Sequence, residues 1–456
     1  MVHKYKLTKE QFADAISKGL GRAALHVKHY GLDDVADILL DACLHNKVYD
    51  TQCEDSRGNW LYAMFSHSPQ YNSFRDSILS ALEKETNSDD IYQLCELVKE
   101  MALDGDEFAR ISLKEFACES AKKPNDTNYF GAEGYLKVWG EEALLDLARI
   151  YGQRLIEDTE DCVYGGLLCD NEARDKYEQL LKEHSYSDPR IKVYFDYLEE
   201  NSGFDASVPL SDSDLAIQWE NSKREFLSQY NAERIIDHAK NDKKERWYEA
   251  EFRKFGRFAD SEELKIVFTE LLNTKDDTVR SKLLKVFATA QLPAISECFF
   301  EWVDSDNEKL RAAVFTALAN CKDDRIHDFA RQRVKDGKVV GWANSFVLEI
   351  FEKNFSDDDA KLITDAILIS KLDKEEDIHH IGLHVTGLAE KNKTDKLKEV
   401  LILVYENTPC SNCRASAVET LCEIKALPSE IKDECLYDGS EEIRDLAKND
   451  FIRPRE

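Results

Sequence analysis

Glycine and proline are both scarce in this chain, which has 18 glycines and 8 prolines among 456 residues. All-β proteins need many glycine-containing turns, whereas helices tolerate neither residue well in their interiors. The shortage therefore favours a helix-rich fold. Hydrophobic residues make up 43% of the chain, as in an ordinary globular protein, so the chain as a whole is not disordered.

Long apolar runs are also missing. No stretch approaches 18 consecutive apolar residues, so we expect no transmembrane helix. Residues 1–20 are amphipathic and lack the apolar centre of a signal peptide. The 12 cysteines are spread along the chain without the dense spacing of a disulfide framework. These features predict a cytoplasmic protein in a reducing compartment.

Basic residues are too few for a general nucleic-acid binder. The chain has 90 acidic and 61 basic residues, a formal net charge of −29. Binding to phosphates requires lysine and arginine, and anionic membrane surfaces would repel this chain. We therefore expect no nucleic acid and no membrane as partner. The charge fits solubility alone, a basic protein partner, or both.

An internal repeat is the clearest positive signal. Residues 276–288, 306–319, 411–424 and 440–451 each contain a capping residue, a short gap, an apolar or thiol residue and then an arginine. The arginines are Arg280, Arg311, Arg414 and Arg444. In the first segment Val279, Leu283 and Phe287 fall on one helical face, with Asp276 or Asp277 as the N-cap. The pattern predicts helix pairs that repeat about every 30 to 40 residues.

This pattern, Asp-x-x-Val/Ile/Leu-Arg-x-x-Ala, resembles the second helix of short HEAT-type repeats over residues 244–451. The resemblance implies an all-α solenoid of stacked antiparallel helix pairs with a right-handed superhelix. It also implies that the aspartate caps the helix and that the four arginines are structural. General physics agrees, because one helix pair cannot bury its apolar face alone, whereas stacked pairs share a continuous core.

We expect three regions. Residues 1–121 read as degenerate helical repeats, and a turn-rich break follows at residues 122–129. Residues 122–215 form a helical middle region that includes a helix over residues 131–154 and ends in an irregular loop at residues 202–214. Residues 216–456 hold the C-terminal repeats.

The tract of residues 155–215 is acidic and rich in tyrosine, with 16 acidic and 5 basic residues. Such a surface could bind a basic protein by imitating nucleic acid. The predicted partner-binding residues are Glu157, Asp158, Glu160, Asp161, Tyr164, Tyr194 and Tyr197.

Two groups of cysteines are candidate metal ligands. Cys43, His45 and Cys53 could be metal ligands, but their spacing matches no structural zinc pattern and suits a helix end and loop equally well. Cys410 and Cys413 form a lone CxxC motif, whereas a strong zinc signal needs two tight pairs. Cys413 also precedes a repeat arginine, as Val279 does, which favours a core position. We therefore predict no bound metal and no cofactor.

Two further groups have ordinary explanations. His379, His380 and His384 lack the glutamate of a metalloprotease motif and are interpreted as surface or half-buried histidines. Residues 243–258 mix basic and aromatic residues, as single-stranded nucleic-acid sites do. Nearby acids favour an amphipathic repeat helix there instead. Glycine-rich phosphate loops and nucleophile elbows are absent from the sequence.

The predicted function is a non-catalytic scaffold or adaptor that binds a protein partner through an acidic solenoid surface. One alternative is an inhibitor or immunity protein that neutralises a basic toxin or nuclease. A second alternative is a DNA-associated enzyme resembling the HEAT-like alkylpurine glycosylases, although their basic concave face conflicts with this acidic chain. The short style of the repeats suggests a bacterial source.

Overall fold

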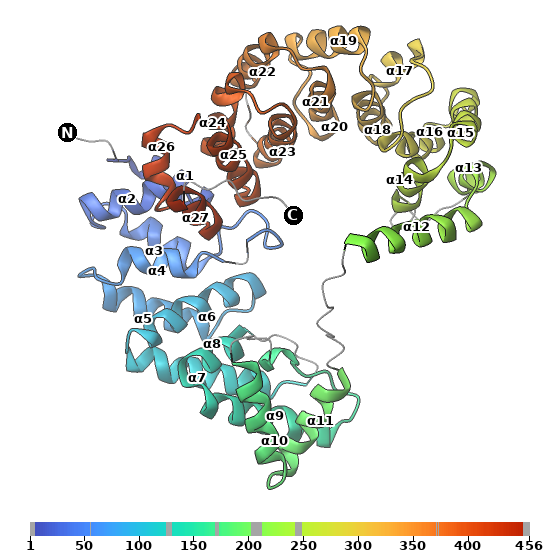
Figure 1. The fold of residues 1–456 in the computed structure, drawn as a ribbon. Helices are drawn as coiled ribbons and strands as arrows, with labels where there is room; N and C mark the ends of the chain where they lie inside the picture. Colours follow the sequence, from blue (N-terminus) through green and yellow to red (C-terminus); the bar gives the residue numbers. More distant parts are fainter. Residues whose placement is uncertain are drawn as a thin grey trace. The chain divides into compact units, whose positions relative to one another are not determined.

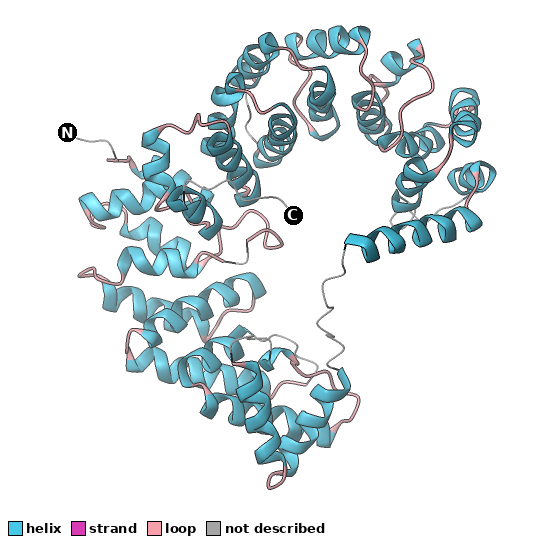
Figure 2. Ribbon diagram, in the orientation of Figure 1, coloured by secondary structure: helices cyan, strands magenta, loops and turns pink. Residues whose placement is uncertain are grey.

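The computed structural model describes residues 5–54, 56–124, 130–168, 173–201, 212–241, 249–370, 372 and 374–449. Every regular element in these residues is a helix, which confirms the all-α prediction (Figure 1, Figure 2). None of the described helices is both long and apolar enough to span a membrane. The chain forms two compact units, residues 1–207 with 433–445 (unit 1) and residues 208–432 with 446–456 (unit 2).

Unit 1 is built from short helices that pack mainly against their neighbours in the sequence. They are α1 (Lys9–Lys18), α2 (Gly21–Tyr30), α3 (Ala36–Leu44), α4 (Gly58–Phe65), α5 (Tyr71–Leu82), α6 (Ser88–Leu103), α7 (Glu107–Ala121), α8 (Phe130–Trp139), α9 (Glu141–Glu157), the 3-10 helix η1 (Gly166–Leu168), α10 (Arg174–Ser185) and α11 (Pro189–Asn201). Helix α6 contacts α4, α5, α7 and α8, and α9 contacts α7, α8, α10 and α11. The core therefore runs continuously from one helix to the next.

Unit 2 continues the same construction. Its elements are α12 (Asp212–Gln229), α13 (Ala232–Asn241), α14 (Glu249–Phe258), α15 (Ser261–Asn273), α16 (Asp277–Leu284), η2 (Lys285–Ala288), α17 (Glu297–Trp302), α18 (Glu308–Ala319), α19 (Asp324–Lys335), α20 (Trp342–Ser345), η3 (Phe346–Ile350), α21 (Phe351–Asn354), α22 (Asp357–Ile369), α23 (Glu375–Asn392), η4 (Asp395–Leu397), α24 (Lys398–Asn407) and α25 (Ser411–Glu423). The last two helices, α26 (Ser429–Cys435) and α27 (Glu441–Asn449), cross the boundary between the units. Helix α25 packs against both α23 and α24, which positions the site described below.

Side-chain caps explain where several helices begin. Asp276 accepts hydrogen bonds from the backbone N–H groups of Thr278 and Val279, so it is the N-cap of α16, one of the two residues predicted for this role. Asn307 caps α18 in the same way. These caps satisfy backbone donors that have no partner within the helix.

The structure corrects one predicted helix. Residues 131–154 are not a single helix, because Gly140 separates α8 from α9. Its φ of 57° lies in the left-handed region, which glycine adopts without a steric penalty. The predicted irregular loop at residues 202–214 falls largely outside the described residues, and α12 begins at Asp212.

The units divide the chain differently from the three predicted regions. One hydrophobic cluster holds Ala117 and Ala121 together with Tyr135, Leu144 and Tyr194. Residue 122 is therefore not a boundary between cores. Residues 433–445, predicted as part of the C-terminal repeats, belong to unit 1, where Gly439 N–H donates to the carbonyl of Gly19 over 2.7 Å.

Candidate functional site

Three metal-ligating side chains meet in unit 2. The ligand atoms of His379, Cys410 and Cys413 all lie within 4.8 Å of one another. His379 belongs to the second turn of α23, Cys410 is the N-cap residue of α25, and Cys413 lies in the first turn of α25. The packing of α23 against α25 brings them together. We call these three residues the His–Cys–Cys cluster.

The cluster is largely shielded from solvent. Cys410 and Cys413 are buried, and His379 is half-buried. The Sγ of Cys413 lies 3.7 Å from the Nδ1 of His379. Close packing of the helices supports this approach, since a Cβ added to Gly382 would lie 3.7 Å from the Cβ of Cys413.

The electrostatic setting of Cys410 favours a thiolate. A hydrogen bond with Cys413 and another with His379 hold the pKa of the Cys410 thiol well below its usual range. The positive end of the helix dipole at the start of α25 acts in the same direction. By contrast, burial raises the pKa of Cys43, and burial together with the charge of Glu96 raises the pKa of Cys95.

The sequence interpretation of these residues needs correction in one respect. Cys413 is buried, as its repeat position suggested, but it faces a histidine and a second thiol as well as apolar neighbours. Sequence reasoning treated His379 and the CxxC motif separately. The sequence does contain a signal for their proximity. His379 and Cys413 are 34 residues apart, which is close to the repeat step and places them on neighbouring repeats.

The other predicted cysteine group is not assembled. Cys43 is buried in α3, whereas the side chain of His45 is 54% exposed and lies near Asp41 and Asp90. The Sγ of Cys53 donates to Asp50 over 3.6 Å. Among the residues that the structure describes, only the His–Cys–Cys cluster gathers three possible ligands.

The two remaining histidines of α23 have separate surroundings. His384 is buried, its Nδ1 lies 3.3 Å from the Oε1 of Glu349, and its ring packs against Phe346. Burial and the nearby His379 lower the pKa of His380, which keeps it neutral at pH 7. Neither histidine is grouped with the His–Cys–Cys cluster.

Part of the predicted partner-binding tract lies in the interior of unit 1. Asp161 is buried and forms an ion pair with Arg154 through two hydrogen bonds of 2.8 and 2.9 Å. Tyr194 is fully buried, and its hydroxyl donates to the carbonyl of Tyr164. The hydroxyl of Tyr197 donates to the carbonyl of Val163. Asp161 and Tyr194 are therefore inaccessible to a partner, whereas Tyr197 is half-buried.

The three predicted partner-binding acids that are exposed lie in a short turn at the end of α9. Glu157, Asp158 and Glu160 are exposed, and so is the apolar side chain of Ile156. None of the three acids forms an ion pair with a described residue. We call residues 156–160 the acidic turn.

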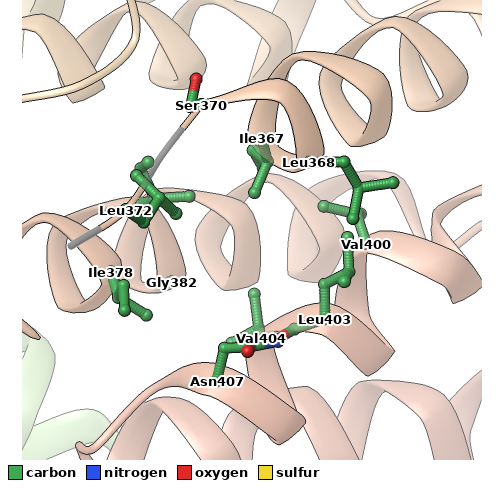
Figure 3. A pocket seen from close by; sticks show the side chains of 11 residues that line it. Ile367, Leu368, Ser370, Leu372, Ile378, Gly382, Val400, Leu403, Val404 and Asn407 are labelled. Atoms are coloured by element: carbon green, nitrogen blue, oxygen red, sulfur yellow. The ribbon is translucent and has the colours of Figure 1, made fainter.

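An apolar groove lies between α22, α23 and α24 (Figure 3). Its volume is about 230 Å³, and the polar lining side chains are Ser370 and Asn407. The apolar lining comes from Ile367, Leu368, Leu372, Ile378, Ile381, Val400, Leu403 and Val404. Leu368 is 62% exposed and the adjacent Ile369 is 81% exposed. We call this feature the α22–α24 groove.

The four repeat arginines contact their own chain. The Nη1 of Arg311 donates to the carbonyl of Ser305, and the Nη1 of Arg444 donates to that of Asp438, in each case six residues earlier. Arg280 pairs with Asp277 and stacks over Trp302. Arg414 is fully buried.

The basic and aromatic segment at residues 243–258 is only partly described, from Glu249 onward. There Phe252, Phe255 and Phe258 are buried, so these rings pack into the core of unit 2. They are not available to stack on the bases of a nucleic acid.

No known family model matches the chain, and a comparison with curated proteins gives no significant match. The function is therefore inferred from the surfaces and clusters described above.

Proposed function

We propose that the chain is a non-catalytic, cytoplasmic scaffold that binds a protein partner, and that its helix pairs form a right-handed α-solenoid of the HEAT-like kind. Packing between sequence neighbours and the matching arginine bonds at Arg311 and Arg444 support the solenoid. The described cysteines are all free thiols, which supports a reducing compartment.

The α22–α24 groove is the observation that carries the proposal. Exposed apolar groups that adjoin a concave apolar surface mark sites where another molecule binds. Leu368 and Ile369 remain in contact with water in the free chain, so covering them would release hydrophobic free energy. The groove suits one or two apolar side chains of a partner, with Asn407 and Ser370 as polar contacts at its margin.

The partner is expected to carry basic residues beside its apolar anchor. Glu375 and Glu376 at the start of α23 are exposed close in sequence to Ile378 of the groove. The whole chain also has a net charge of −29, which would steer a basic partner toward it.

A substitution in the groove tests this function. Leu368→Asp places a charge where the partner's apolar anchor would lie, and we expect at least a tenfold loss of affinity for a partner isolated from native extract. Ile266→Asp is the matched control, because Ile266 is an exposed apolar residue of α15 outside the groove. Equal binding by both variants would show that the groove is not the binding site.

The acidic turn supports a second candidate function, inhibition of a basic toxin or nuclease. Its three acids form no ion pair with a described residue and lie close in sequence to the exposed Ile156, a combination that fits a basic surface with an apolar group. Neutralising Glu157, Asp158 and Glu160 together should slow association with such a partner. Neutralising the exposed Glu178, Glu183 and Glu200 is the control of equal charge. Equal association rates for the two triple variants would exclude a specific role for the turn.

The DNA-associated enzyme is the least supported of the three. The net negative charge opposes phosphate binding, and the aromatic rings of α14 are buried. A gel shift at low salt would detect DNA binding, and its absence would remove this alternative.

A further inference from the structure

We propose that His379, Cys410 and Cys413 together bind a zinc ion. This site goes beyond the scaffold function and does not depend on it. The chain would then carry a metal that fastens two helices of unit 2, α23 and α25, to each other.

The donor set matches the metal. Thiolates and imidazoles are the ligands that zinc takes most often in proteins, and harder ions such as magnesium prefer oxygen. The described residues hold three such donors at one place, contributed by two helices that are distant in sequence. Other repeats have an apolar residue in the position of Cys413, namely Val279 and Leu310 before their arginines, so packing alone does not require a thiol there.

The spacing also fits. With zinc bonds of about 2.3 Å to sulfur and about 2.0 Å to nitrogen, the sulfur and the nitrogen ligand of a tetrahedral site lie about 3.5 Å apart. The distance from the Sγ of Cys413 to the Nδ1 of His379 is 3.7 Å. All three ligand atoms lie within 4.8 Å of one another, so small side-chain rotations would complete the arrangement.

The fold holds both cysteines at the start of one helix and away from solvent. Cys410 is the N-cap residue of α25 and Cys413 lies in its first turn, so both thiols are held at the same end of this helix. The low exposure of both cysteines would slow exchange of the metal with solvent.

The described residues supply three protein ligands and no fourth histidine, cysteine or acidic residue. Zinc held by three side chains keeps its fourth position for water. Because the metal binds the folded arrangement, it would stabilise unit 2 and raise its unfolding temperature.

The first test uses the wild-type full chain. After purification under reducing conditions and dialysis, elemental analysis should find about one zinc per chain. Alkylation of the native protein, read peptide by peptide by mass spectrometry, should spare Cys410 and Cys413 until a chelator is added. A chain that holds no zinc and takes up none when zinc is added would overturn the proposal. A disulfide between these cysteines that forms equally fast with and without zinc would also overturn it.

The second test uses variants and a cobalt probe. Co²⁺ added to the metal-free chain should give a thiolate charge-transfer band and visible absorption of four-coordinate geometry. Cys410→Ser and Cys413→Ser should each abolish the thiolate band or reduce it by more than half, and His379→Gln should weaken binding at least tenfold. Cys298→Ser and His380→Gln are the controls, and they should bind as the wild type does. Ligand variants that keep the helical circular dichroism and the full cobalt signal would contradict the assignment.

Discussion

At the scale of single residues, burial decides what the acidic composition means. Asp161 and Glu157 stand four positions apart in the same acidic tract, yet Asp161 is buried against Arg154 and Glu157 is exposed. Arg154 also donates to the carbonyls of Ala121 and Cys162, so hydrogen bonds hold its guanidinium in place beside Asp161. A count of charges along the sequence cannot separate these roles, because it does not show which acids have a buried cation beside them.

The buried pair gives the first prediction. Asp161→Asn leaves the charge of Arg154 buried without its counter-ion, so we expect unit 1 to lose about 3 kcal/mol of stability. Denaturation in urea followed by circular dichroism measures the loss. Asp158→Asn, three positions away and exposed, should change stability by less than about 0.5 kcal/mol. Similar curves for the two variants would mean that the pair contributes no net stabilisation.

A second prediction concerns pH. Hydrogen bonds, first from Arg190 and then from Arg149, lower the pKa of Asp188 to about 2. Because the unfolded value is about 3.9, the stabilisation is complete above pH ~4 and is lost as the pH falls toward ~2. Solvent screens this pair, so Asp188→Asn should cost about 1 kcal/mol at pH 7.

The difference in stability between Asp188→Asn and the wild type should shrink as the pH falls below ~4. Urea titrations at a series of pH values would follow it. Glu178→Gln on α10 serves as the control, since Glu178 is exposed and has no ion pair among the described residues. A constant difference at all pH values would show that the charge of Asp188 is not the cause.

At the scale of elements, local sequence signals predicted where helices begin but not which helices pack against each other. The cap at Asp276 and the apolar face of α16 follow from spacing alone. The break at Gly140 could not be predicted in this way, because glycine also occurs inside helices. Only its φ of 57° in the structure shows that a helix ends there. The His–Cys–Cys cluster depends on how α23 packs against α25, and that register is a tertiary property.

Helix packing gives the third prediction. Helix α9 passes so close to α11 that a Cβ added at Gly152 would lie 1.8 Å from the carbonyl oxygen of Arg190. Gly152→Ala must therefore push the helices apart, and we expect a loss of about 2 kcal/mol in thermal or urea unfolding. Gly165→Ala is the matched control, because the nearest atom to its added Cβ lies 3.9 Å away. A Gly152→Ala protein as stable as this control would contradict the close packing of α9 and α11.

At the scale of the whole molecule, composition predicted the helical class but not the grouping of the chain. The scarcity of glycine and proline and the helical periodicity were sufficient for an all-α fold. A repeat pattern places each segment beside its sequence neighbours, so it could not reveal that residues 433–445 join unit 1. That placement rests on particular contacts, such as Trp60 donating to the carbonyl of Tyr437 over 2.8 Å.

The two candidate binding surfaces would hold a partner by different forces. If the α22–α24 groove is the main contact, the complex should resist salt, because burial of apolar surface is not screened by ions. If the acidic turn dominates, the complex should weaken steeply as salt rises, because exposed charges are screened. The two surfaces thus differ in a measurable quantity.

The most direct measurement is the dissociation constant of the isolated partner from the wild-type chain, from Leu368→Asp and from Ile266→Asp, at low and at moderate salt. We expect the wild-type dissociation constant to change little with salt, that of Leu368→Asp to be at least tenfold higher at both salt concentrations, and that of Ile266→Asp to equal the wild-type value. Affinity that falls steeply with salt and is unchanged by Leu368→Asp would contradict a scaffold that binds through the groove.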